Sequence, residues 1–153
     1  MHIATNSSKF DISKESQTAK LANKFSKILK KGDVIFLIGE IGTGKTTFVK
    51  YLINFLEKSK KKKLSEITSP TFSILNEYRV KNLKIRHYDL FRLKKKNDVK
   101  NIGLFENINE YITFIEWPEK VSKNFEIKYN IYFRLNLNSK KRFVEINKEN
   151  NYL

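Results

Sequence analysis

The chain has 153 residues, a formal net charge of +15 from 31 Lys and Arg against 16 Asp and Glu, and no cysteine. This length suits a single domain, which we expect over residues 1–153, and the lack of cysteine excludes disulfide bonds, thiolate metal sites and cysteine nucleophiles. No apolar run approaches the about 18 residues that a membrane-spanning helix needs, and residues 1–10 lack a secretory signal, so we expect a cytoplasmic protein without membrane contact.

The positive charge allows two interpretations. Only five of the basic residues are Arg, whereas Lys, Asn and Ile, which share AT-rich codons, are abundant. Phosphate recognition favours Arg, whose planar guanidinium suits that geometry, so drift in base composition is the favoured explanation. A basic surface that meets an acidic partner is the alternative.

Hydrophobic spacing predicts a helix, a strand and a second helix in the first part of the chain. Apolar residues at helical spacing indicate a helix over residues 13–29, with Ser13 as its N-cap. The apolar run of residues 33–39 is typical of a strand buried on both faces. A second helix is expected to begin at Lys45 and to end near the lysine-rich stretch of residues 58–63.

The second part of the chain is predicted to form mainly strands. Alternating apolar residues and short apolar runs indicate strands, joined by turns at Asn82 and Asn138, and one short helix. The expected strands cover 71–79, 84–93, 112–116, 130–137 and 142–146, and the expected helix covers 98–106. The order of elements predicts an α/β fold with a central mixed sheet, flanking helices and a C-terminal β-hairpin.

Residues 39–46 match the phosphate-binding pattern G-x-x-x-x-G-K-[ST], between a predicted strand and a predicted helix. Glycines let backbone N–H groups surround a phosphate, Lys45 would reach the β- and γ-phosphates, and the Thr46 hydroxyl would ligate Mg²⁺. A glycine-rich turn without a ligand is the alternative. The expected nucleotide-binding residues are Gly39, Glu40, Ile41, Gly42, Thr43, Gly44, Lys45, Thr46 and Thr47. The expected fold is therefore that of P-loop NTPases.

Two carboxylates stand at the ends of predicted strands, where open α/β sheets bind ligands. Glu116 would complete a Mg²⁺ site with Thr46, and the alternative is an ordinary exposed strand end. Asp89 would orient the attacking water or join the Mg²⁺ shell. An ion pair with Arg92 or Arg86 is the alternative for Asp89.

The neighbours of these acids are harder to interpret. His87 alone is more often structural, and Trp117 suits the core, a cover over the site or a partner surface. Residues 68–71 offer three hydroxyls around a proline, which suits either a loop that senses the γ-phosphate or a simple turn before a strand.

Four segments then occur in the order GEIGTGKTTF (39–48), TSPTF (68–72), HYDLFRL (87–93) and FIEWPE (114–119). Together they resemble the TsaE family, small ATPases of bacterial tRNA threonylcarbamoyladenosine synthesis, from about residue 13 to residue 146. The resemblance implies that Lys45, Asp89 and Glu116 are catalytic and that Thr46 and Glu116 hold the metal. It also implies a switch-like loop over residues 68–71.

By the same resemblance, ATP and Mg²⁺ are the expected cofactors, and Trp117 would lie near the nucleotide. The expected partner is a TsaB–TsaD pair that carries the transferase site, with tRNA as the substrate of the complex at the adenosine beside the anticodon. ATP hydrolysis is expected to be weak alone and stimulated by the pair. Arg142 matches a family arginine, and residues 13–18 are candidates for the adenine pocket.

Two features depart from the family pattern. Phe91 replaces the commoner Tyr, and the segment of residues 58–63 is longer and more basic than usual.

Three other classes of protein compete with this interpretation. A GTPase is disfavoured because no Asn-Lys-x-Asp motif occurs. A small-molecule kinase should carry an arginine-bearing lid, and an RNA-binding protein should carry an RNA-reading motif, neither of which is evident in the sequence.

Overall fold

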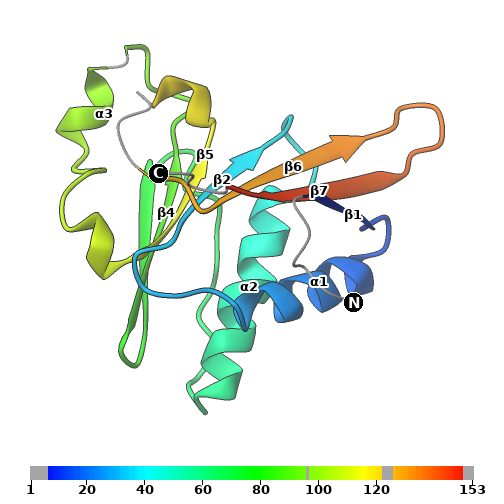
Figure 1. Ribbon diagram of the computed structural model, residues 1–153, viewed down its shortest axis with the longest axis horizontal. Coiled ribbons are helices and arrows are strands. Elements are labelled where there is room, and N and C mark those ends of the chain that lie inside the picture. Colours follow the sequence, from blue (N-terminus) through cyan, green and yellow to red (C-terminus); the bar gives the residue numbers. More distant parts are fainter. Residues whose placement is uncertain (1–6, 96, 122–125, 150–153) are drawn as a thin grey trace.

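A computed structural model describes residues 7–95, 97–121 and 126–149, and in this part of the chain one seven-stranded sheet forms the centre of the fold (Figure 1). The strands follow the order β1-β7-β6-β2-β5-β4-β3 across the sheet. Neighbouring strands from β6 to β4 are parallel, whereas β1, β7 and β3 pair antiparallel at the two sides. Their bounds are β1 Ser7–Asp11, β2 Val34–Ile38, β3 Leu75–Val80, β4 Leu83–Asp89, β5 Ile112–Glu116, β6 Tyr129–Leu135 and β7 Arg142–Lys148. The predicted mixed sheet and C-terminal hairpin are confirmed.

The helices cover the sheet unequally. The two long helices, α1 (Glu15–Ser26) and α2 (Lys45–Ser59), lie together on one side of the sheet (Figure 1). The other side is covered by the short helix α3 (Asp98–Asn101), the 3₁₀ turns η1 (Ile108–Glu110) and η2 (Pro118–Lys120), and the loops between them. Within the described ranges, no helix is long and apolar enough to cross a membrane.

Each face of the sheet has its own buried core. Phe25 of α1 and Phe48 of α2 pack with Leu37 and Phe133 on one face, while Tyr88 packs with Leu90, Leu104 and Ile115 on the other. Successive side chains in a strand point to opposite faces. Residues 85, 87 and 89 of β4 and residues 112, 114 and 116 of β5 therefore share the face of α2. This alternation directs His87, Asp89 and Glu116 toward the beginning of that helix.

The start of the first helix differs from the prediction. Ser13 is not its N-cap, because the Ser13 backbone N–H donates to the Asp11 carboxylate at 2.8 Å and its hydroxyl contacts the backbone of Arg142. The capping residue is Lys14, whose N–H donates to the side chain of Gln17 at 2.8 Å. The helix then ends at Ser26 instead of residue 29.

The predicted strand over residues 71–79 begins only at Leu75. The Ile74 N–H donates to the Pro70 carbonyl at 2.6 Å, and Ile74 has a φ of +68°, which no strand residue adopts. The strand predicted over 84–93 ends at Asp89, after which the Leu90 N–H donates to the Glu116 carbonyl. The helix predicted over 98–106 is a single turn that ends at Asn101.

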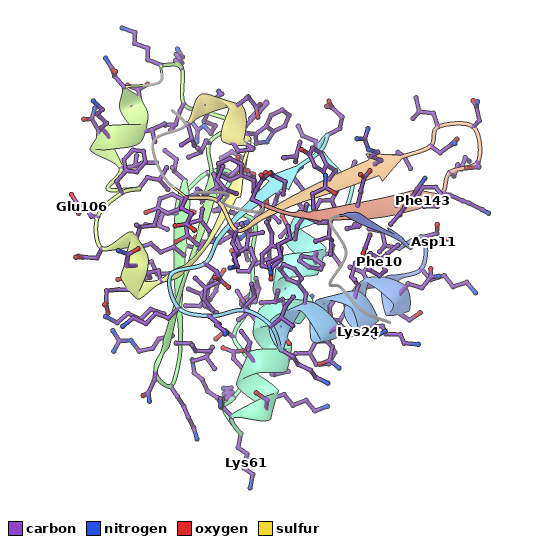
Figure 2. All side chains as sticks on the ribbon, in the orientation of Figure 1. Phe10, Asp11, Lys24, Lys61, Glu106 and Phe143 are labelled. Atoms are coloured by element: carbon purple, nitrogen blue, oxygen red, sulfur yellow. The ribbon has the colours of Figure 1, made fainter. Side chains whose placement is uncertain are left out.

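The edges of the sheet contain one strand that the sequence did not reveal. Strand β1 reads SSKFD and pairs with β7, so that Asp11 lies opposite Phe143 (Figure 2).

At the far end of α2, the exposed Lys61 of the lysine-rich stretch points away from the protein (Figure 2). The turn at Asn82 joins β3 and β4 as predicted.

Candidate nucleotide site

The loop between β2 and α2 has the backbone conformation that the phosphate-binding pattern predicts. Gly42 and Gly44 have φ of +78° and +109°, values that only glycine adopts without strain, and Gly44 is the N-cap of α2. A Cβ on Gly39 would lie 2.5 Å from the carbonyl oxygen of Phe133. The loop therefore depends on its glycines, and it presents the N-terminus of a long helix, where anions are favoured.

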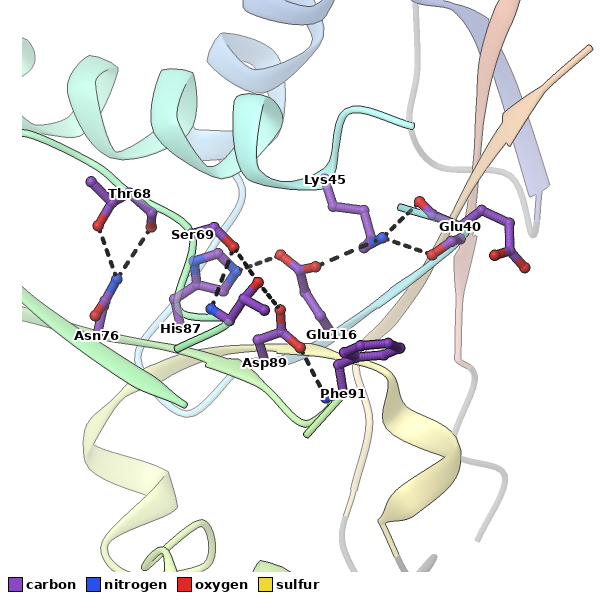
Figure 3. A network of polar contacts seen from close by, with 11 residues as sticks. Glu40, Lys45, Thr68, Ser69, Asn76, His87, Asp89, Phe91 and Glu116 are labelled. Atoms are coloured by element: carbon purple, nitrogen blue, oxygen red, sulfur yellow. Dashed lines mark hydrogen bonds and ion pairs between the residues drawn. The ribbon is translucent and has the colours of Figure 1, made fainter. Parts of the chain in front are cut away.

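Lys45 places a positive charge beneath this loop. Its side chain is buried, with 5% of its surface exposed. The Nζ atom donates to the carbonyl oxygens of Gly39 at 2.7 Å and Glu40 at 2.9 Å, and it lies 3.7 Å from Oε2 of Glu116 (Figure 3). These contacts hold the ammonium group in one place.

Glu116 ends β5 and is buried, with 4% of its surface exposed, so an ordinary exposed strand end is excluded. Its Oε1 atom lies 2.9 Å from Nε2 of His87 on the neighbouring strand β4 (Figure 3). The sequence left His87 as a structural residue, and the structure brings it into direct contact with the predicted metal ligand. The signal that would have found it is its period-two spacing from Asp89.

Asp89 lies directly opposite Glu116 in the parallel register of β4 and β5. Its Oδ2 atom accepts a hydrogen bond from the Thr71 hydroxyl at 2.7 Å, and its Oδ1 atom accepts one from the Phe91 N–H at 2.9 Å (Figure 3). Arg86, one of the two arginines proposed to pair with it, instead forms an ion pair with Glu77 at 2.9 Å.

The other arginine, Arg92, lies over the ring of Phe72, at 5.6 Å from the ring centroid. Phe72 belongs to the loop of residues 68–74, and 85% of its surface is exposed. The loop is held by short-range contacts: Ser69 and Thr71 share a hydrogen bond of 2.7 Å between their hydroxyls, and the Asn76 amide donates to the Thr68 carbonyl at 3.2 Å. A hydroxyl-bearing loop thus faces Asp89.

One cavity of about 270 Å³ lies between the glycine loop, the carboxylates of Asp89 and Glu116, and the loop of residues 68–74. Trp117 and Phe91 form part of its wall, with ring centroids 5.0 Å apart, and the Trp117 ring lies 5.5 Å from the Lys45 ammonium. Trp117 therefore borders the site. The cavity is lined by Ile41, Gly42, Gly44, Lys45, Thr46, Thr47, Ser69, Thr71, Asp89, Phe91, Glu116 and Trp117.

Three of the predicted nucleotide-binding residues lie outside this cavity. Gly39, Glu40 and Thr43 border a separate groove beside β6. The Thr43 hydroxyl donates to the Glu40 carbonyl at 2.7 Å. The side chain of Thr43 therefore stabilises the shape of the loop.

A second cavity of about 220 Å³ lies on the other side of the loop and shares Gly42, Gly44 and Thr47 with the first. Ser13, Glu15, Thr18 and Arg142 contribute to its lining. Hydrogen bonds from Ser13 hold the pKa of the adjacent Asp11 below its usual value. Residues 13, 15 and 18, from the stretch named as a candidate for the adenine pocket, thus border a cavity next to the glycine loop.

The donor set fits a magnesium–nucleotide complex better than a metal held by protein alone. Among the described residues, no group of three or more His, Asp or Glu side chains could hold a metal ion. Mg²⁺ is usually bound through one or two protein oxygens together with substrate phosphates and water. Thr46 and Glu116 line the same cavity and would supply such oxygens.

Comparison with known proteins agrees with these features. A model of the family "Threonylcarbamoyl adenosine biosynthesis protein TsaE" matches residues 12–145. The chain is 33% identical over 143 residues to the tRNA threonylcarbamoyladenosine biosynthesis protein TsaE of Rickettsia typhi, covering 91% of this chain and 94% of the relative. It is 42% identical over 106 residues to the protein of that name from Aquifex aeolicus, covering 69% and 73%.

Coverage varies among the relatives. With the TsaE protein of Rickettsia conorii the chain shares 36% identity over 108 residues, which span 71% of this chain and 59% of the relative. The fold is similar to the crystal structure of YdiB from Bacillus subtilis, with a TM-score of 0.72, 24% identity, and coverage of 99% of this chain and 90% of that one. The glycine loop, the paired acids and the family match lead to one conclusion: the chain belongs to the TsaE family of tRNA threonylcarbamoyladenosine biosynthesis proteins.

Proposed function

We propose that this chain binds ATP with Mg²⁺ and hydrolyses it in support of tRNA threonylcarbamoyladenosine synthesis. The observation that carries the proposal is the buried contact between Lys45 and Glu116 beneath a glycine loop, with Asp89 beside it. A buried ammonium and carboxylate are costly to keep in a protein that uses neither. A triphosphate with its metal ion would engage both charges.

Each side chain has a separate task in this proposal. The Lys45 ammonium and the loop N–H groups neutralise charge on the β- and γ-phosphates, and the Thr46 hydroxyl and the Glu116 carboxylate hold Mg²⁺. The metal ion, when bound, neutralises charge that develops on the phosphate oxygens. The rings of Trp117 and Phe91 contact each other and form an apolar part of the cavity wall beside these charged groups.

Asp89 is the group that orients the attacking water. Its two carboxylate oxygens already accept hydrogen bonds from Thr71 and the Phe91 backbone, so the side chain is held in one orientation. A carboxylate oxygen has a further lone pair available to a water molecule. The contact with Thr71 links this water position to the loop of residues 68–74.

The second cavity is the place that we assign to the adenosine half of the nucleotide. It adjoins the glycine loop, and its lining offers hydroxyl, carboxylate and guanidinium groups from Ser13, Glu15 and Arg142. Replacing Thr18, which is 4% exposed and lines the cavity, by a larger residue such as Leu should therefore weaken ATP binding more than inorganic phosphate binding.

In the pathway, the chain is proposed to act with a TsaB–TsaD pair that carries out the transfer to tRNA. The relatives are named as tRNA threonylcarbamoyladenosine biosynthesis proteins, which supports the pathway. Hydrolysis by the chain alone would be slow, and the pair would stimulate it. The tRNA would be the substrate of the whole assembly.

Steady-state ATP hydrolysis, measured alone and with the purified pair titrated in, tests this function. Saturable stimulation that disappears in Lys45→Ala would support an ATPase subunit of the modification complex. Hydrolysis that is indifferent to the pair would contradict the partnership. ATP consumption that requires an added small-molecule acceptor would instead indicate a kinase.

A further inference from the structure

We propose that His87 is a positioning residue, which orients the Glu116 carboxylate so that one of its oxygens is presented to the metal–phosphate site. The inference rests on the proposed function, since it concerns how that site is held. It is carried by the 2.9 Å contact between His87 Nε2 and Glu116 Oε1, made inside the protein between two neighbouring strands (Figure 3).

Strand pairing fixes the backbone positions of His87 and Glu116 on the two sides of this contact. Strands β4 and β5 are parallel neighbours, with His87 opposite Phe114 and Asp89 opposite Glu116. His87 has no exposed surface, and Glu116 is 4% exposed. A carboxylate that holds a metal ion accepts hydrogen bonds only, so in the proposed role Nε2 of His87 is the atom that donates to Oε1.

An imidazole at this buried position destabilises the folded state more than an apolar side chain would. Its second nitrogen, Nδ1, is buried and has no hydrogen-bond partner among the described residues. An unsatisfied buried polar atom destabilises the folded state, and an apolar side chain of similar size would avoid that cost. The contact with Glu116 is the interaction that the ring makes and that a leucine could not make.

The consequence is that the two oxygens of Glu116 are no longer equivalent. Oε1 is directed at His87, whereas Oε2 lies 3.7 Å from Nζ of Lys45, and both Lys45 and Glu116 line the cavity. Partners behind a metal-binding side chain fix its orientation and raise its affinity for the metal. His87 therefore restricts Glu116 to the arrangement in which Oε2 is available, while Asp89, two residues along the same strand, faces the same site.

Nucleotide binding with and without Mg²⁺ tests this role, and Trp117, the only tryptophan of the chain, provides a fluorescence signal from the cavity wall. Binding of ADP is titrated at fixed Mg²⁺, without Mg²⁺, and as a function of Mg²⁺. In His87→Leu, the Mg²⁺ concentration for half-maximal binding should rise about 10-fold, while ADP affinity without Mg²⁺ stays unchanged. In His87→Gln, whose amide N–H reaches a position near Nε2, the shift should be no more than about threefold.

Tyr88→Phe is the matched control. Tyr88 is the next residue of β4, is equally buried, faces the other core, and has a hydroxyl without a hydrogen-bond partner within the described ranges. Its variant should show the wild-type Mg²⁺ dependence. Thermal unfolding of every variant separates loss of the site from loss of the fold.

Three results would overturn the inference. The first is an unchanged Mg²⁺ dependence in folded His87→Leu, and the second is an equal loss of ADP affinity with and without Mg²⁺. If His87→Leu does not fold, His87→Gln is compared with His87→Asn, whose shorter amide does not reach Glu116. The third result is an equal Mg²⁺ dependence in these two variants. A wild-type protein without Mg²⁺-dependent nucleotide binding would instead refute the proposed function itself.

Discussion

The two sides of the cavity are built in opposite ways. On one side, Lys45 and Glu116 line the cavity from a helix and a strand, and His87 supports Glu116 from the next strand. At most 5% of the surface of each of these residues is exposed. On the other side, the loop of residues 68–74 is largely exposed and is held by side-chain hydrogen bonds within residues 68–76 and by the hydrogen bond from Thr71 to Asp89. Charges are on the rigid side, and neutral hydroxyls are on the loop.

The difference follows from the free energy of misplacing each group. A buried charge that loses its partner destabilises the protein strongly, so it must be held by elements that do not move. A half-exposed hydroxyl exchanges its partner for water at little cost, and segments with few buried contacts open most easily. The loop side is thus the side suited to respond to a bound phosphate.

The largest effect is expected on the rigid side, from Lys45→Ala. Removing the ammonium takes away the main charge facing the phosphates, so kcat for ATP hydrolysis should fall about 1,000-fold. The matched control is Lys50→Ala, which removes an exposed lysine from the same helix. Comparable loss in both variants would show that helix charge in general, and not the buried ammonium, supports hydrolysis.

Glu116→Gln should rank second. The amide keeps the shape of the carboxylate but removes the charge that holds Mg²⁺, so we expect kcat to fall about 100-fold and a higher Mg²⁺ requirement. Hydrolysis is measured over a range of Mg²⁺ at saturating ATP. Glu119→Gln, which changes an exposed carboxylate three residues further on, should behave as wild type.

On the loop side, Thr71→Val should have a smaller effect. The variant keeps the shape of the side chain and removes the 2.7 Å hydrogen bond to Asp89, whose other oxygen keeps the Phe91 N–H. A hydrogen bond to a charged group contributes about 1.5–3 kcal/mol, and the lower end of this range, which suits a partly exposed loop, corresponds to a roughly 10-fold fall in kcat. Thr71→Ser should restore most of the activity. A loss as large as that of Lys45→Ala would mean that the loop is as strictly required as the charges.

The segment that precedes the loop provides a test in which only the free energy of unfolding should change. Glu57 of α2 has no exposed surface, accepts a hydrogen bond from the Ser65 N–H at 2.7 Å, and lies 3.5 Å from Nζ of Lys62. Glu57→Gln should lower the free energy of unfolding by about 1–3 kcal/mol without changing kcat at low temperature. Urea unfolding measures this change, and Glu66→Gln, at an exposed position, is the control.

The smallest effect is expected at Asp11, beside the second cavity. Hydrogen bonds from Ser13 lower the pKa of this exposed carboxyl from its usual 3.8. Its contribution to stability is therefore present above pH 3.8 and is lost as the pH falls through the lower pKa of the folded state. The difference in urea midpoint between wild type and Asp11→Asn should shrink from pH 6 to pH 3. A constant difference over this range would exclude the carboxylate as its source.

Local features of the chain were readable from the sequence. The glycine loop of residues 39–46 is contiguous, and its shape follows from positive φ at Gly42 and Gly44 and from the start of a helix at Lys45. Strands β2 and β5 were predicted because their apolar runs suit burial on both faces. Glu116 and Asp89 were each predicted as site residues because they stand at strand ends, where open α/β sheets bind ligands, whereas their position directly opposite one another comes from the strand register.

Only the tertiary structure decided which side chains meet across distant segments. The contact of His87 with Glu116 joins residues 29 positions apart, and that of Thr71 with Asp89 joins residues 18 apart, both set by strand register and loop path. Strand β1 lacks an apolar alternation and forms because β7, from the far end of the chain, offers an edge. Short-range patterns reflect local conformation, whereas these contacts depend on packing that no local pattern encodes.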